Sequence, residues 1–346
     1  INDLATVVGG GTPDTTVKSY WGGDIQWFTP SEIGKNKYVD FSKRTITRDG
    51  LDNSSAKLLP LHTILLSSRA TVGECSIASN ECTTNQGFQS LIAKQCNIDF
   101  LYYLIQTKKK DLIRNACGST FLEISANEIR KIKVAVPVQN EQEQIAKLLS
   151  LIDERIATQN KIIEKLQSLI KGLAAQLTQS GTPNIRLCDC LECHSSTLQE
   201  NCVSVTGSYP VYGATGLIGY TNNYAYNGES ILIVKDGSGV GSLSYVNDHF
   251  SVIGTLNYLT AKENYSILYL YYALMAFNFT PYITGMAIPH IYFKDYGKAK
   301  LFYPSIEKRI RIASLLHNIE QKLVVEQNLV ISLSAQKSYL LRMLFI

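Results

Sequence analysis

The amino-acid sequence contains the same pattern twice, offset by 167 residues. The segment 137–177 aligns without a gap with the segment 304–344. Matches upstream of these segments pair Ile64-Leu65-Leu66 with Ile231-Leu232-Ile233 and Leu101-Tyr102-Tyr103 with Leu270-Tyr271-Tyr272. Because solenoid repeats have periods of about 20 to 50 residues, an offset this large indicates a duplicated domain.

Each copy ends in a stretch whose apolar residues alternate at intervals of four and three. In the first copy these positions are Ile145, Leu149, Ile152, Ile156, Gln159, Ile163, Leu166, Ile170, Leu173 and Leu177. In the second copy they are Ile312, Leu316, Ile319, Leu323, Glu326, Val330, Leu333, Lys337, Leu340 and Leu344. This spacing is typical of the a and d positions of a coiled coil, so it predicts two long helices that pack along one seam.

Both seams are interrupted by a polar residue at the same repeat position, Gln159 in the first copy and Glu326 in the second. A buried polar residue at such a position commonly fixes the register of a coiled coil at some cost in stability. We therefore expect Gln159 and Glu326 to set the register of the two helices. The helices are expected to run antiparallel, because the globular segment between them must return the chain.

The remaining sequence predicts two related globular domains of mixed composition. Short β-like runs bounded by Gly, Asn and Ser alternate with helical stretches, which is typical of an α+β fold. The expected organisation is α+β with a pseudo-two-fold duplication, in which two globular domains are separated by an antiparallel coiled coil. Its segments are residues 1–137, the helix 138–181, residues 182–303 and the helix 304–346.

Motifs that carry catalysis are absent from the sequence. There is no Gly-x4-Gly-Lys-Ser/Thr phosphate loop and no Asn/Asp-Pro-Pro-aromatic loop of the kind that grips a flipped base. The glycines of 237–241 superficially resemble a dinucleotide loop, but their counterpart in the first copy lacks the pattern, which favours a turn between strands. We expect no catalytic residues in this chain.

A metal site and a membrane segment are also not expected. Cys188, Cys190, Cys193 and His194 contain only one Cys-x2-Cys spacing, whereas zinc ribbons use two, and the first copy has no counterpart. Eight cysteines in 346 residues are too sparse for a disulfide scaffold and indicate reduced thiols in a cytoplasm. No run of about 18 apolar residues is present, so a membrane span is not expected.

The net charge of +4 is too small to indicate nucleic-acid binding by itself. DNA contact would have to rely on individual polar side chains in the loops, because Arg and Gln read bases while Ser, Thr and Lys more often hold phosphates. The candidates are Thr12, Lys18, Arg69, Gln86, Ser119, Thr120, Tyr212, Thr215, Lys235 and His290. Nearby aromatic residues, including Trp21, Trp27 and Tyr209, are interpreted as parts of the domain cores.

With these residues identified, the chain resembles a specificity (S) subunit of a type I restriction–modification system along nearly its whole length. The first copy carries Gly-Gly-Thr-Pro at 10–13, Tyr-Trp-Gly-Gly-Asp-Ile-x-Trp at 20–27 and Asn-Gln-Gly-Phe at 85–88. It also carries Gly-Ser-Thr at 118–120, and the second copy has Tyr-Pro-Val-Tyr-Gly-Ala at 209–214. Each motif alone is moderately specific for this family, whereas the motifs together with the duplication indicate it strongly.

The resemblance implies a non-catalytic subunit that recognises double-stranded DNA. Each globular segment would be a target recognition domain that reads one half of a bipartite site, and the helices would set the spacing and dock two methyltransferase (M) subunits. It implies no cofactor on this chain, S-adenosylmethionine on the methyltransferase subunits, and Mg and ATP on motor-nuclease (R) subunits. Family members carry residues before the position of Ile1, so the natural chain is expected to begin earlier.

A second interpretation comes from a different class of protein. The same pattern of two globular domains and two heptad helices is compatible with a coiled-coil scaffold that binds other proteins and has no role on DNA. A titration of DNA binding against salt discriminates between the two, because phosphate contacts release counterions and give a steep salt dependence.

Overall fold

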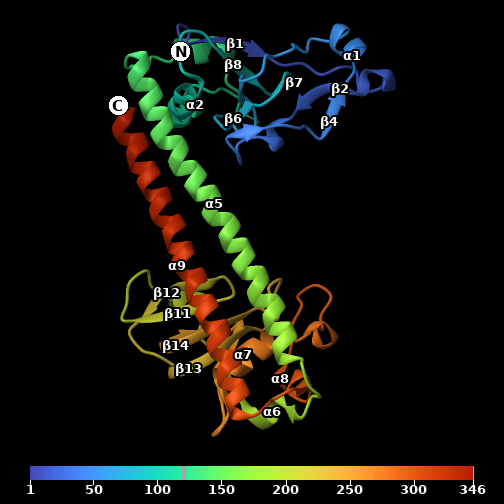
Figure 1. The fold of residues 1–346 in the computed structure, drawn as a ribbon, viewed down its shortest axis with the longest axis vertical. Coiled ribbons are helices and arrows are strands. Elements are labelled where there is room, and N and C mark those ends of the chain that lie inside the picture. The colour runs from blue at the N-terminus through green and yellow to red at the C-terminus, as the bar shows by residue number, and fades with distance from the viewer. Residues whose placement is uncertain (119–121, 346) are drawn as a thin grey trace. The chain divides into compact units, whose positions relative to one another are not determined.

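A computed structural model describes residues 1–118 and 122–345, and in it the chain divides into two compact units. Unit 1 comprises Ile1–Thr158 and Val330–Ile346, whereas unit 2 comprises Gln159–Leu329. The divisions fall inside two long helices, α5 (Gln139–Thr178) and α9 (Ile306–Leu344). Each unit therefore contains one globular domain together with a part of both helices (Figure 1).

The globular part of unit 1 is built on two sheets. The larger sheet has the strand order β1-β8-β5-β6-β3, formed by Ala5–Gly9, Gln89–Ala93, Ile64–Leu66, Cys75–Ala78 and Tyr38–Val39. The smaller sheet has the order β4-β2-β7, formed by Arg44–Ile46, Trp21–Phe28 and Cys82–Thr84. The short helices are η1 Lys18–Tyr20, η2 Pro30–Glu32, α1 Arg48–Asp52, α2 Ile98–Thr107, α3 Lys109–Arg114 and α4 Ala126–Lys131.

The globular part of unit 2 is built on one larger sheet and one strand pair. The sheet has the order β10-β15-β13-β14-β11-β12, formed by Leu191–Ser195, Leu256–Ala261, Tyr226–Val234, Leu243–Val252, Tyr209–Gly213 and Gly216–Thr221. The pair is β16 (Lys300–Leu301) with β9 (Ile185–Arg186). The short helices are α6 Leu187–Cys190, η3 Glu200–Cys202, α7 Ile267–Met275, η4 Thr280–Tyr282 and α8 Phe293–Tyr296.

The duplication in the sequence is also present in the topology. In unit 1, β8 lies between β1 and β5, and β5 pairs with β6, all antiparallel. In unit 2, β15 lies between β10 and β13, and β13 pairs with β14, again antiparallel. This shared four-strand order, with helices beside it, confirms the predicted α+β class.

Helices α2 and α7 begin in the same way in the two units. The side chain of Asn97 accepts a hydrogen bond from the backbone N–H of Phe100 at 3.0 Å, and Ser266 accepts one from Tyr269 at 3.3 Å. Such caps satisfy N–H groups that the first helical turn leaves unpaired. Both helices are almost entirely buried, and their apolar faces join the cores formed by the sheets and the long helices.

The heptad positions of α5 and α9 face protein in both units. None of the seam residues named above is exposed, and the most buried are Leu149, Ile170, Ile312 and Leu316. Residues near the start of α5 share a hydrophobic core with Phe345, which directly follows α9. Ala174, near the end of α5, shares a core with Ile312, near the start of α9. This order of contacts is that of antiparallel helices. The periodicity therefore predicted which face of each helix is covered.

Candidate nucleic-acid interface

A short bridge in unit 1 holds two loops together. Arg69 and Glu123 form an isolated antiparallel β-bridge, as do Cys117 and Glu123. The Arg69 guanidinium donates from Nη2 at 2.7 Å and from Nε at 3.1 Å to Oε2 of Glu123. The backbone N–H of Ile124 also donates to the carbonyl of Ser68 at 2.9 Å. We call this arrangement bridge 1.

Unit 2 contains the same bridge at the same repeat offset. Asp236 and His290 form an isolated antiparallel bridge, as do Thr284 and His290. The backbone N–H of Ile291 donates to the carbonyl of Lys235 at 2.9 Å, as Ile124 does in unit 1. The Lys235 ammonium pairs with the Asp236 carboxylate. We call this arrangement bridge 2.

Bridges 1 and 2 have a common backbone and different side chains. Arg69 of bridge 1 corresponds to Asp236 of bridge 2, and Glu123 corresponds to His290, so a basic and an acidic side chain exchange places. Three of the predicted contact residues therefore lie in the two bridges, Arg69 in bridge 1 and Lys235 and His290 in bridge 2. Sequence inspection did not predict the acidic partners of Arg69 and Lys235.

A second group of predicted residues meets in unit 1. The hydroxyl of Thr12 donates to the side-chain carbonyl of Gln86, although the two lie far apart in the sequence. The loop that carries Thr12 is fixed by two contacts of Gly11, whose N–H donates to the Thr84 carbonyl at 2.8 Å and whose carbonyl accepts from Trp27 Nε1 at 2.9 Å. At the preceding Gly10, a Cβ would lie 2.0 Å from a backbone oxygen, so only glycine fits.

The other predicted residues do not join these groups. Lys18 and Thr215 are exposed, and their side chains make no hydrogen bond or ion pair with any residue that the structure describes. Tyr212 is half-buried with its ring 6.3 Å from that of a buried phenylalanine, and this burial raises its pKa. Ser119 and Thr120 lie outside the described residues.

The sequence did not predict a further candidate, Arg44 at the start of β4. Its guanidinium carbon lies 3.6 Å from the ring centroid of Trp21 and 5.3 Å from that of Trp27. The two indole rings are perpendicular with centroids 5.0 Å apart. Trp27 is buried, as expected, whereas Trp21 is only half-buried and keeps one face for the arginine.

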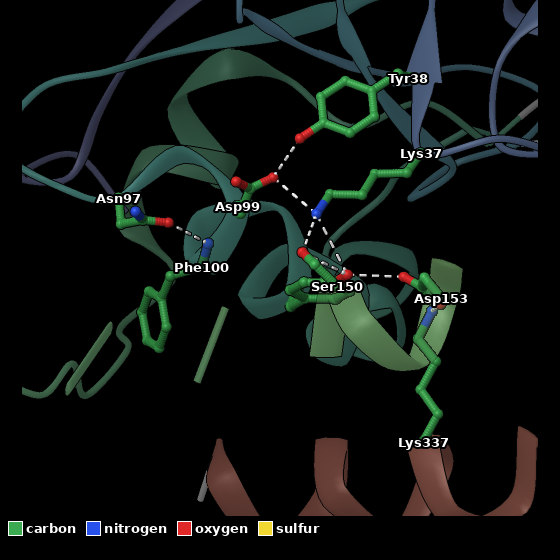
Figure 2. A network of polar contacts seen from close by, with 9 residues as sticks. Lys37, Tyr38, Asn97, Asp99, Phe100, Ser150, Asp153 and Lys337 are labelled. Carbon is green, nitrogen blue, oxygen red and sulfur yellow. Dashed lines mark hydrogen bonds and ion pairs between the residues drawn. The ribbon is translucent and has the colours of Figure 1, made fainter. Parts of the chain in front are cut away.

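A polar network joins the domain of unit 1 to its long helices (Figure 2). Lys37 Nζ contacts Asp99 Oδ1 at 2.7 Å and Ser150 Oγ of α5 at 2.6 Å. The hydroxyl of Tyr103 donates to Asp153 Oδ2 at 2.7 Å, and the other oxygen of Asp153 pairs with Lys337 of α9 at 2.6 Å. Burial is the main cause that raises the pKa of Tyr103, so the hydroxyl remains a donor at neutral pH.

Unit 2 repeats the central contact of this network. The hydroxyls of Tyr271 and Tyr272 donate to the two carboxylate oxygens of Glu320 at 2.9 and 2.7 Å. Glu320 stands in α9 at the repeat position that Asp153 occupies in α5. A tyrosine–carboxylate contact therefore anchors each globular domain to a long helix in the same way.

The polar interruptions of the two seams meet within unit 2. Gln159 Nε2 donates to Glu326 Oε2 at 2.9 Å, and Glu326 Oε1 pairs with Lys322 at 2.9 Å. Gln159 is 5% exposed and Glu326 is 9% exposed, so the amide depends on the carboxylate for its hydrogen bond. The role of this pair in setting the helix register stays a prediction.

We expect Glu326→Leu to lower the free energy of unfolding by about 1–3 kcal/mol, because it leaves the buried Gln159 amide without its acceptor. Adding Gln159→Leu should restore most of this loss, since a fully apolar seam needs no hydrogen bond. Urea denaturation measures both changes, and Gln327→Leu on the exposed side of α9 is the control. A double variant as unstable as Glu326→Leu alone would contradict the pairing.

Neither a metal cluster nor an activated thiol is found at the cysteines that the sequence analysis considered for zinc and whose pKa is shifted, Cys190 and Cys193. In residues 1–118 and 122–345, no three His, Cys, Asp or Glu side chains gather where they could hold a metal. Burial raises the pKa of Cys190 to about 12 and that of Cys193 to about 11, which keeps both thiols protonated at neutral pH. In the same part of the chain, no helix is long and apolar enough to cross a membrane.

Comparisons with known proteins agree on one family. The family model described as "Type I restriction modification DNA specificity domain" matches residues 1–168 and 185–333. The type I restriction enzyme MjaIX specificity subunit of Methanocaldococcus jannaschii is 40% identical over 177 residues, which cover 48% of this chain and 40% of that subunit. The EcoprrI specificity subunit of Escherichia coli is 25% identical over 346 residues, which cover 90% of this chain and 84% of the relative.

The fold comparison agrees with the sequence comparisons. The crystal structure of the type I restriction–modification S subunit from M. genitalium matches with a TM-score of 0.67 at 18% identity. The match covers 100% of this chain and 94% of that one. The chain thus shares its fold over its whole length, while it matches less than half the length of the MjaIX subunit.

Proposed function

The chain belongs to the family of type I restriction–modification DNA specificity domains, and on this premise we propose that it is a non-catalytic subunit that recognises a bipartite DNA site. Each globular domain, residues 1–137 and 182–303, acts as a target recognition domain and reads one half of the site. The observation that carries the proposal is the pair of equivalent bridges, 1 and 2, with different side chains on one backbone arrangement.

Two half-sites of different base sequence require different contacting side chains, and the two bridges present different side chains on the same backbone arrangement. In the major groove, Arg favours guanine, Glu can accept from cytosine, and Gln is suited to adenine. Bridge 1 offers Arg69 and Glu123, and bridge 2 offers Lys235 and His290. Thr12 and Gln86 add a hydroxyl and an amide in the first domain. Contacts from Lys18, Ser119, Thr120, Tyr212 and Thr215 are also proposed.

The long helices are proposed to set the spacing between the half-sites and to dock two methyltransferase subunits. Leu148 in α5 is 44% exposed and Leu315 in α9 is 47% exposed, although both are large apolar residues. They occupy the same repeat position, one in each unit, which supports two equivalent docking surfaces. The methyltransferase subunits would bind S-adenosylmethionine, and motor-nuclease subunits that use Mg and ATP would join the complex in the cytoplasm.

Salt-dependent DNA binding is the test that separates this proposal from a protein-binding scaffold. We expect the full chain to bind duplex DNA with a logarithmic salt slope of about −0.9 for each phosphate contacted, because every contact releases counterions. Fluorescence anisotropy of a labelled duplex between low and physiological salt measures the slope. A chain that binds no duplex at low salt, while circular dichroism shows it folded, would favour the scaffold.

A further inference from the structure

We propose that Arg44 is a base-reading residue of the first target recognition domain, and that Trp21 positions its guanidinium. This inference rests on the proposed function, because it needs the domain to bind DNA. It adds a residue that does not belong to either bridge. It also gives a role to the half-buried Trp21, which packs against the edge of the core cluster that contains Trp27.

The geometry of the stack is that of a strong cation–π contact. The Arg44 guanidinium carbon is 3.6 Å from the Trp21 ring centroid, well within the distance of about 6 Å at which such contacts are favourable. Trp21 is itself supported edge-on by the buried Trp27. The guanidinium is therefore held on a rigid base although Arg44 is exposed.

The same two tryptophans support the loop that carries Thr12. Trp21 Nε1 donates to the carbonyl of Asp14 at 3.1 Å, and Trp27 Nε1 donates to the carbonyl of Gly11 at 2.9 Å. Thr12 lies between these two anchors and bonds to Gln86. Arg44 and the Thr12–Gln86 pair are thus parts of one supported surface.

The guanidinium N–H groups of Arg44 differ from those of Arg69 in having no partner among the described residues. The Arg69 guanidinium donates two of its N–H groups to Glu123, whereas the Arg44 guanidinium makes no hydrogen bond or ion pair with any residue in the described ranges. Stacking uses the face of the guanidinium and leaves the N–H groups on its edge, which are the groups that contact guanine O6 and N7 in pairs. Because the stack already restricts the side chain, less conformational entropy is lost on binding.

This arrangement is confined to the first domain. Trp21 and Trp27 are the two tryptophans of the chain, and both lie in unit 1. Loss of Arg44 should therefore affect one half of a bipartite site and leave the other unchanged. That asymmetry can be measured on whichever target sequence the wild-type chain selects.

The experiment first selects duplexes from a random pool with the wild-type chain and then repeats the selection with Arg44→Ala. We expect one position of one half-site to become degenerate and the affinity for the wild-type target to fall about tenfold or more. Arg44→Lys should retain the salt slope but lose the discrimination, since an ammonium has no planar fork. Arg114→Ala, which removes an exposed arginine elsewhere in unit 1, is the matched control and should change neither.

A double-mutant cycle tests the positioning role of Trp21. Because Trp21 also supports the loop of Thr12, the cycle is measured in a Thr12→Ala background. There, Trp21→Leu is expected to relax the same position as Arg44→Ala, and adding both should weaken binding no more than Arg44→Ala does. Additive losses would overturn the positioning role. Thermal unfolding of each variant checks that the domain remains folded.

Each failure has a distinct signature. If the wild-type chain selects no sequence and shows no salt-dependent binding, the proposed function itself fails. If the wild type selects a target and Arg44→Ala selects the same one with the same affinity, Arg44 does not contact DNA. A uniform loss of affinity for all sequences would assign Arg44 to a phosphate and would overturn the base-reading role.

Discussion

Exchanging residues 1–136 for the equivalent domain of another family member is expected to replace one half of the methylated DNA motif and to leave the other half as it was. The expectation follows from the two bridges, since the exchange removes Arg69 and Glu123 but retains Asp236 and His290. The motif is measured by sequencing the methylated bases in cells that produce the chimaera together with the methyltransferase (M) subunits of the same system.

The structure restricts which donor domain suits this exchange. Residues of helix α2 share a hydrophobic core with Ile145 and Leu149 of α5, and Tyr103 of α2 donates to Asp153. A donor with tyrosine and apolar residues at the matching positions should preserve this interface, whereas one without them would leave Asp153 without the hydroxyl and Lys337 without the aromatic ring. The reciprocal exchange of residues 182–303 is the control and should change only the other half-site. A change in both halves after either exchange would contradict independent reading.

Inserting four residues after Lys161 is expected to lengthen the unspecified gap of the DNA site by about one or two base pairs while both half-sites stay the same. Four helical residues add about 6 Å along the axis, and successive base pairs are about 3.4 Å apart. The insertion is close to one helical turn, so apolar residues beyond it return to nearly the same face. Coiled coils usually absorb such a stutter by local unwinding.

An insertion after Lys161 should leave the helix contacts of the residues that precede it unchanged. Gln159 lies just before it and keeps its hydrogen-bonding distance to Glu326, while the residues from Ile163 onward shift. The control is an insertion of equal length after Val205, an exposed residue of unit 2, which should not alter the gap. A methylation map with the original gap, from an active protein with the insertion verified, would mean that the helices do not set the spacing.

The duplication, the long helices and their buried faces were predictable because each is recorded in the spacing of residues along the chain. A helix that repeats its apolar positions every seven residues must cover the same face at every turn. The structure accordingly leaves none of the seam residues exposed. The repeated polar positions, Gln159 and Glu326, were found for the same reason.

The candidate interface was predictable only in part, since sequence identifies polar residues in loops but not their partners. Arg69 and Lys235 are candidates from their residue type, yet each is paired with a carboxylate. The carboxylate of Glu123 is 54 residues from Arg69 in the chain, so no local pattern records the contact. Thr12 and Gln86 are separated by 74 residues and meet for the same reason.

The sequence by itself determined that the chain is a duplicated α+β protein with two heptad helices and no recognisable catalytic motif. The tertiary structure alone decided which charged side chains are paired with a neighbouring residue and which are not. The antiparallel pairing of β4 with β2 places Arg44 opposite Trp27, and an irregularity in β2 between Trp21 and Ile25 brings Trp21 opposite Ile46, so that its indole also lies beside the arginine. Strand pairing of this kind depends on how the whole sheet closes, and the residues in either strand do not specify it alone.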